Sequence, residues 1–211
     1  MFQIAIDGPA GSGKSTIAKL LATKLNFVYI STGKYYRTYA YIIKKFNLTI
    51  DEFINKSNSF EILINQNEVF VNQKNISELI NNENIGNLAS NIATNKEIRK
   101  IAVNAQKEFA KNNSVVMDGR DVGTVILPNA QLKIFLIADS KIRALRRIKE
   151  YNLDTSKLDL IKNEIENRDL RDLNREIDPL VQADDAICID TSNLTIDEVI
   201  NKIIELYQQR I

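Results

Sequence analysis

The segment GPAGSGKS, Gly8–Ser15, constrains the fold more than any other part of this sequence. It matches the pattern G-x-x-x-x-G-K-[ST], in which glycines permit a tight backbone turn that ends in a lysine and a hydroxyl. A short apolar run, Gln3–Asp7, precedes it, and apolar residues at helical spacing follow Lys14. A plain glycine-rich turn would also join a strand to a helix. The lysine and hydroxyl at this fixed spacing favour instead a strand–loop–helix unit whose N–H groups bind phosphate.

Five short apolar runs predict buried strands. None of them alternates between polar and apolar residues, which is typical of strands covered on both faces of a parallel sheet. The runs are Gln3–Asp7, Phe27–Ser31, Ser114–Asp118, Lys133–Asp139 and Ala186–Asp190. Helical patterns lie between them, which favours right-handed βαβ units. We therefore predict an α/β P-loop NTPase fold, with a doubly wound five-stranded parallel sheet and helices on both faces.

Two segments depart from this alternation of strands and helices. The residues from Ser59 to Asn75 alternate around Asn65-Gln66-Asn67, which predicts a β-hairpin, and two helical patterns follow at 82–93 and 95–112. A charged stretch lacks strand character and precedes the last strand. We predict one domain with a core (1–31, 114–150 and 176–211), a β-containing insertion (about 32–113) and a helical lid (about 151–175).

The composition excludes several kinds of chemistry. The 211 residues include no histidine and one cysteine, Cys188, which rules out Ser-His-Asp and Cys-His catalysis, His-ligated metals, internal disulfides and cysteine zinc clusters. Lys and Arg number 28 against 27 Asp and Glu, so we expect binding to neither nucleic acid nor membrane. The start resembles no signal peptide, and the lone cysteine indicates a reducing compartment. We expect a cytoplasmic monomer.

A loop of this kind is found in three classes of nucleotide-binding protein: GTPase switches, ATPase motors and small-molecule kinases. A switch needs Asn-Lys-x-Asp to read guanine, and the near match Asn95–Ile98 ends in isoleucine. A motor usually has a glutamate after its metal-linked aspartate, whereas Gly119 follows Asp118 here. The pattern therefore favours a kinase. An ATP-dependent binding or regulatory module without turnover stays open as the alternative.

The donor ATP is predicted to lie on the glycine-rich loop. Lys14 would bridge its β- and γ-phosphate oxygens, and Ser15 would hold Mg²⁺, with Asp118 assisting through water. Arg146, on the helix after the fourth strand, would reach ATP, whereas Arg143 and Arg147 are predicted to be surface charges. The predicted donor residues are Gly8, Pro9, Ala10, Gly11, Ser12, Gly13, Lys14, Ser15, Thr16 and Arg146.

Charged residues in three places suit a second, phosphorylated substrate. One predicted helix carries a set at i, i+3, i+4 and i+7, and on a helix these share a face: Arg168, Arg171, Asp172 and Arg175. Guanidinium groups bind phosphate oxygens in pairs, although a solvated face of Arg–Asp pairs would give the same spacing. Arg37 and the pair Arg120-Asp121 follow strands, at the carboxyl edge where open α/β sheets bind ligands.

These residues belong to longer stretches that resemble bacterial cytidylate kinases (CMP/dCMP kinases) from end to end. The stretches are IAIDGPAGSGKST, STGKYYR, MDGRDVGTVILPNA, KIFLIAD, NRDLRDLNR, DPLVQADDA and IDTSNLTIDEVI. The combination of DGRD-x-GT with RD-x-x-D-x-x-R is far more specific than the loop alone. The resemblance implies transfer of the γ-phosphoryl group of ATP to CMP or dCMP, and it implies that the insertion binds the monophosphate. A kinase for another nucleoside monophosphate is the alternative within this class.

The resemblance also supplies roles that spacing alone does not. It implies that Thr32, Arg37, Arg120 and Arg175 surround the monophosphate, that Arg168 and Asp172 meet the ribose, and that Ser90, Arg99 and Asp121 read cytosine. Lys14, Arg120, Arg168 and Arg175 would be catalytic. Cytosine presents an amine donor beside acceptors, and uracil presents the opposite pattern at that edge. Lys34, at a position that is commonly small or apolar in the family, is expected near the acceptor site.

Overall fold

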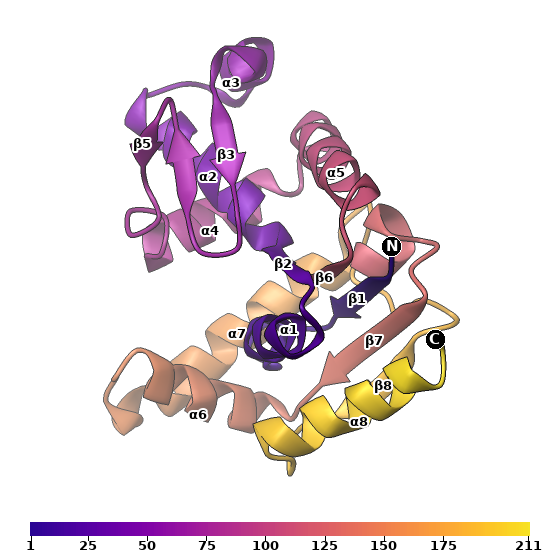
Figure 1. The fold of residues 1–211 in the computed structure, drawn as a ribbon. Coiled ribbons are helices and arrows are strands. Elements are labelled where there is room, and N and C mark those ends of the chain that lie inside the picture. The colour runs from indigo at the N-terminus through magenta and orange to yellow at the C-terminus, as the bar shows by residue number, and fades with distance from the viewer.

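Five parallel strands form the centre of the protein, which a computed structural model describes over residues 1–211 (Figure 1). In spatial order they are β2 (Val28–Ser31), β6 (Val115–Gly119), β1 (Gln3–Asp7), β7 (Leu132–Ile137) and β8 (Ile187–Asp190). Each strand overlaps one of the five predicted runs. The predicted α/β fold class, with a five-stranded parallel sheet, is confirmed.

The carboxyl end of β1 is the point where the order of the strands reverses. From β1 the chain passes to β2 and β6 on one side, and later to β7 and β8 on the other. Asp7 there lies beside Gly119 of β6 and Phe135 of β7. Ligands of open parallel sheets bind outside such a switch point, and the Gly8–Ser15 loop begins there. Both termini lie toward the opposite end of the sheet (Figure 1).

Helices cover both faces of the sheet. The apolar residues of α1 (Lys14–Leu25) and α8 (Ile196–Gln208) pack on one face, in a cluster of 15 buried residues. The other face packs against α5 (Lys96–Lys111) and α2 (Thr32–Lys45), in a cluster of 28 buried residues that extends into the insertion. Because this larger cluster is continuous, the insertion is fixed to the sheet by apolar burial. None of the helices has both the length and the apolar character that a membrane crossing requires.

The segment between β2 and β6 contains the predicted hairpin and the two predicted helices. Strands β3 (Ile62–Ile64) and β4 (Val69–Val71) pair in antiparallel fashion, and α4 (Glu83–Ile92) precedes α5. Two further elements were not predicted: α3 (Ile50–Lys56), which begins with a capping box from Thr49 to Glu52, and β5 (Lys74–Asn75). The β4–β5 turn uses Asn72 and Gln73 at φ 47° and 65°, so it lacks the glycine that usually marks such turns.

Two helices form an arm beside the glycine-rich loop. They are α6 (Ser140–Glu150) and α7 (Leu158–Leu173), linked by the short 3-10 helix η3 (Thr155–Lys157), and they pack along each other (Figure 1). Their small shared core contains Ala144, Ile148, Ile161 and Ile165, and it also includes Ala10 of the loop. The arm is therefore packed against the loop as well as against itself.

Candidate functional site

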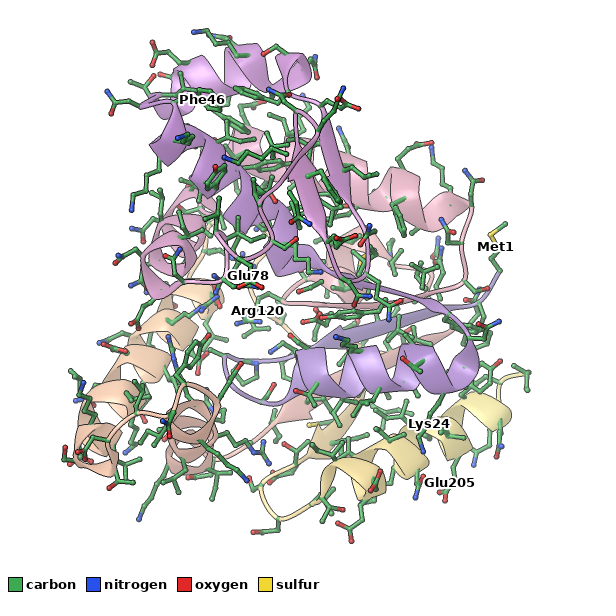
Figure 2. All side chains as sticks on the ribbon, turned by 60° about the vertical axis from the view of Figure 1, so that its left-hand side comes forward. Met1, Lys24, Phe46, Glu78, Arg120 and Glu205 are labelled. Atoms are coloured by element: carbon green, nitrogen blue, oxygen red, sulfur yellow. The ribbon has the colours of Figure 1, made fainter.

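A cavity of about 900 Å³ lies at the carboxyl ends of β2 and β6, where the glycine-rich loop, α4 and α7 face one another. Figure 2 shows Arg120 in this region, between the insertion and α1. Predicted residues that line the cavity are Ala10, Gly11, Ser12, Gly13, Lys14, Ser15, Thr16, Thr32, Arg37, Ser90, Asp118, Arg120, Asp121, Arg146, Arg168, Asp172 and Arg175. Gly8, Pro9 and Arg99 do not line it. The structure thus brings most of the predicted site together from distant parts of the chain.

The loop wraps around the start of α1 because of its glycines. Gly8 has φ 144°, and a Cβ there would overlap the carbonyl oxygen of Leu136, so only glycine fits. The side chain of Lys14 folds back over the loop, and its Nζ donates to the carbonyl of Pro9 at 2.6 Å and to Ser12 Oγ at 3.3 Å. Burial, together with the nearby charges of Arg120 and Arg168, lowers the pKa of Lys14 well below its usual value.

Asp118 ends β6 beside the hydroxyl of Ser15. Ser15 Oγ donates to Asp118 Oδ2 at 2.8 Å, and the Tyr29 hydroxyl donates to Asp118 Oδ1 at 2.8 Å. A hydroxyl and a carboxylate are oxygen ligands of the kind Mg²⁺ prefers, and Mg²⁺ usually takes its other ligands from water and phosphates. Sequence reasoning missed Tyr29, which lies in an apolar strand pattern.

Three cations, Lys14, Arg120 and Arg168, lie close together in the cavity. Arg120 Nε donates to Asp172 Oδ2 at 2.8 Å, and Arg168 comes from the same face of α7 as Asp172. Burial and the neighbouring charge of Arg120 lower the pKa of Arg168 to about 10. The Nε atoms of Arg168 and Arg175 are buried without a hydrogen-bond partner. Unpaired buried donors and mutually repelling cations are the features expected of a site that binds a polyanion.

Arg171 does not join this group, contrary to the predicted shared face. Its side chain is exposed, and its Nη1 donates to Asn91 Oδ1 on α4 at 2.9 Å. It is absent from the cavity lining because Arg168 and Asp172, not Arg171, turn inward from α7. The helix ends at Leu173, so Arg175 reaches the cavity from the following loop, where its Nη2 donates to the carbonyl of Asp178 at 2.5 Å.

Two of the three predicted base-reading residues, Arg99 and Asp121, belong to a buried ion-pair network. Arg99 is 1% exposed; its Nη2 pairs with Asp121 Oδ2, and its Nε donates to Asp178 Oδ2 at 2.8 Å. Its guanidinium also lies over the ring of Tyr36, 5.7 Å from the centroid. Arg99 therefore lies behind Asp121 rather than in the cavity wall. Burial raises the pKa of Asp121, against the opposing effect of Arg99.

Two further polar residues, Ser90 and Asp178, belong to this end of the site. Ser90 Oγ is buried without a hydrogen-bond partner and lines the cavity, so it is free to bind a ligand. Sequence reasoning missed Asp178, which has φ 50° and holds Arg99 through its carboxylate and Arg175 through its carbonyl. Its place in an irregular loop gave no spacing signal.

Asp7 is a third residue that sequence reasoning missed, and it positions the loop that carries Arg120 and Asp121. Its carboxylate accepts from the N–H groups of Val122 at 2.9 Å and Gly123 at 2.7 Å, at the start of the π-helix η2 (Val122–Ile126). Burial, against these two hydrogen bonds, raises its pKa to about 6. The apolar strand pattern around Asp7 hid this contact from sequence reasoning.

Several predicted residues are held by backbone groups. Arg37 Nη1 donates to the carbonyls of Ile80 at 2.7 Å and Asn82 at 3.1 Å, and Thr32 Oγ1 donates to the carbonyl of Asp118 at 2.9 Å. Lys34 does not itself line the cavity, although its neighbours Thr32 and Gly33 do. Its Nζ donates to the hairpin-turn carbonyl of Gln66 at 2.8 Å, so it holds the hairpin against α2.

The three arginines of α6 differ in environment. Arg146 and Arg147 both line the cavity, so Arg147 is not the plain surface charge that was predicted. Arg146 donates to Thr191 Oγ1 at 3.0 Å, and Arg147 pairs with Glu83 at 3.3 Å. The prediction that Arg143 is a surface charge is wrong, since it is 7% exposed. It is buried because the loop carbonyl of Ala10 and a carboxylate of α7 accept its guanidinium donors.

Comparison with known proteins agrees with the resemblance seen in the sequence. The family model described as cytidylate kinase matches residues 4–209. The chain is 50% identical to cytidylate kinase of Mycoplasmoides gallisepticum, over 99% of this chain and 94% of that protein, and 48% identical to that of Mycoplasma pneumoniae, over 97% and 95%. Among solved structures, shikimate kinase of Bacteroides thetaiotaomicron has a similar fold, with a TM-score of 0.52 at 14% identity and 98% coverage of both chains.

Proposed function

Because the chain belongs to the cytidylate kinase family, whose members transfer the γ-phosphoryl group of ATP to CMP or dCMP, we propose that this cavity holds both nucleotides for in-line transfer. The enzyme is a nucleoside monophosphate kinase of pyrimidine nucleotide metabolism. The triphosphate lies on the loop from Gly8 to Thr16, with Arg146 beside it. The monophosphate lies on Thr32, Arg37, Arg120 and Arg175, and its ribose meets Arg168 and Asp172.

The crowding of Lys14, Arg120 and Arg168 is the observation that carries this proposal. Each is largely buried, and their mutual repulsion lowers the pKa of Lys14 and of Arg168 below their usual values after burial itself. The closeness of the Lys14 and Arg168 charges to Arg120 is unfavourable for these two groups in the free protein, whereas, against burial, Asp172 raises the pKa of Arg120 itself. It becomes favourable when the negative charge of the transferring phosphoryl group lies among the three side chains.

The reaction needs positioning and charge neutralisation more than proton transfer. The attacking oxygen belongs to a phosphate that is already an anion at neutral pH, so the absence of histidine costs the enzyme nothing. Ser15 and Asp118 would hold Mg²⁺, which supplies further neutralisation of the phosphate oxygens when bound. We propose that 151–175 acts as the lid that excludes water, so that transfer is favoured over hydrolysis.

The base is proposed to lie against Ser90 and Asp121. Because Arg99 occupies Asp121 Oδ2, the other oxygen, Oδ1, is left to accept from the exocyclic amine of cytosine. The unpartnered Ser90 hydroxyl supplies a second polar contact. We therefore assign Arg99 the role of orienting Asp121. A cytoplasmic monomer that binds neither nucleic acid nor membrane stays a prediction.

Replacing Asp121 by asparagine is expected to lower the CMP-to-UMP ratio of kcat/KM by about 10²-fold. Arg99 would bind the amide oxygen of the new side chain and leave its NH₂ group facing the cavity. That group repels the amine of cytosine but donates to O4 of uracil. Steady-state kinetics with CMP and UMP measures the ratio.

Asp184→Asn is the matched control, since Asp184 is an exposed carboxylate outside the cavity. Its ratio is expected to equal that of the unaltered protein. An unchanged ratio for Asp121→Asn would show that Asp121 does not read the base. Arg99 keeps its contact with Asp178 in either case, which limits the loss of stability.

A further inference from the structure

One carboxylate, that of Asp169 on α7, joins the arm to the glycine-rich loop. Its Oδ1 accepts from the N–H of Ala10 at 2.9 Å, and its Oδ2 pairs with Nη1 of Arg143 on α6. Nη1 of Arg143 in turn donates to the carbonyl of Ala10 at 2.9 Å. Asp169 and Arg143 are 8% and 7% exposed. Both backbone polar groups of Ala10 are therefore held by a buried ion pair between the two helices of the arm.

The surrounding packing makes this contact stiff. A Cβ on Gly11 would lie 3.2 Å from the Cβ of Arg143, so the loop lies directly against α6. Ala10 also packs in the small core that includes Ala144 and Ile165. Because close-packed groups transmit displacements, a shift of α7 is expected to move the loop with it.

The position of Asp169 in the sequence connects the two substrate sites. It directly follows Arg168 and precedes Asp172 by three residues, and both of these line the cavity whereas Asp169 does not. One turn of α7 thus places Arg168 and Asp172, which are proposed to bind CMP, in the cavity, and places Asp169 against the ATP-binding loop. This contact fixes how far Arg168 lies from Lys14 on the loop.

We propose that Asp169 is a positioning residue that couples the ATP-binding loop to the CMP-binding face of α7. The proposal rests on the proposed function, because it uses the assignment of those two nucleotides to the two sides of the cavity. Asp169 does not line the cavity, and it contacts the ATP-binding loop only through the backbone of Ala10. It acts through Ala10 and α7, by fixing the position of the loop relative to Arg168 and Arg175. A misplacement of reacting groups by about 1 Å lowers the rate on the order of 10²-fold.

The test is a comparison of Asp169→Ala with the unaltered enzyme in kinetics and in binding. We expect kcat to fall by about 30–100-fold, while the Kd of CMP alone and of a non-hydrolysable ATP analogue alone each change by about 3-fold or less. In the unaltered enzyme the analogue should tighten CMP binding, and CMP should tighten analogue binding by the same factor. In the variant this reciprocal factor should fall toward one.

A second variant covers the case in which Asp169→Ala leaves Arg143 as an uncompensated buried charge and fails to fold. The double substitution Asp169→Leu with Arg143→Met replaces the ion pair by apolar groups, a change that buried pairs often tolerate. It should fold and show the same loss of kcat and of reciprocal tightening. Asp185→Ala is the control, because Asp185 binds another buried cation, Lys133, at 2.8 Å outside the cavity. It should lower Tm and leave kcat unchanged.

The outcomes separate the two claims. If the folded Asp169 variants keep both kcat and the reciprocal factor while Tm falls, Asp169 is structural only and the coupling proposal is wrong. If kcat falls but the reciprocal factor is unchanged, the coupling proposal is also wrong. If the unaltered protein fails to phosphorylate CMP, the proposed function fails instead.

Discussion

Replacing Lys14 by methionine is expected to lower kcat/KM for CMP phosphorylation by about 10³-fold, with Tm unchanged or raised. Lys14 is the cation of the loop, and in the proposed function it neutralises charge that grows as the phosphoryl group moves between nucleotides. Its pKa is lowered in the free protein by burial, Arg120 and Arg168, which means that its charge opposes folding there. Methionine removes both the catalytic charge and this cost. Steady-state kinetics and thermal unfolding measure the two effects.

Lys133 supplies an unusually close control. It is also a buried lysine, 6% exposed against 5% for Lys14, and its Nζ donates to the carbonyl of Pro128 at 2.6 Å, as Lys14 does to Pro9. Unlike Lys14, it has a carboxylate partner, Asp185, and lies outside the cavity. Lys133→Met should therefore lower Tm and leave kcat/KM within about 3-fold. Near-normal activity in Lys14→Met would contradict the assigned role of the loop.

Arg168→Met is expected to lower kcat/KM for CMP by about 10²-fold and to raise Tm by a few degrees, about the shift that 1 kcal/mol gives. Burial and Arg120 lower the pKa of Arg168 to about 10, so in the free protein its charged form is disfavoured relative to the unfolded chain. Its Nε is buried without a partner. Removing the side chain relieves repulsion but takes away a donor to the substrate. A fall in kcat/KM together with a rise in Tm is the distinctive result.

Arg171→Met, one turn further along α7, is the control for this substitution. Arg171 is exposed and lies outside the cavity, so kcat/KM should stay within about 2-fold. Removal of one partner of a buried ion pair usually lowers Tm. Such a fall for Arg168→Met would show that the cations of the cavity do not repel one another as described.

The strands and the main helices could be predicted because their signals are local. Each strand is a short apolar run, although at the sheet edge β8 leaves Cys188 exposed. Helices α4 and α5 begin at asparagines, Asn82 and Asn95, whose side chains cap them. The β5 strand was missed because its turn places asparagine and glutamine in the left-handed region. The short α3 helix was missed because seven residues carry too little periodicity to be distinguished from a loop.

The cavity lining could be predicted where its residues belong to a recognisable motif. Lys14, Arg120 and Arg168 belong to such motifs, and the structure brings them together. Asp169 and Asp178 stand in stretches that carry the family resemblance, yet no role could be read for them there. Like Tyr29, they act through distant partners, at 159 positions for Asp169, 79 for Asp178 and 89 for Tyr29, which no local spacing reveals. Arg143 was misassigned for the same reason. Its partners Ala10 and Asp169 come from two distant segments, so only the folded chain shows that it is buried.

The release of ADP from ATP and Mg²⁺ in the presence of CMP, dCMP, UMP or AMP tests the central claim most directly. The purified chain is expected to release ADP rapidly with CMP and dCMP, and more slowly by about 10²-fold or more in kcat/KM with UMP and AMP. It should release almost none without an acceptor, because the closed cavity excludes water. Equal rates with CMP and UMP, or ADP release that does not depend on any acceptor, would contradict the account.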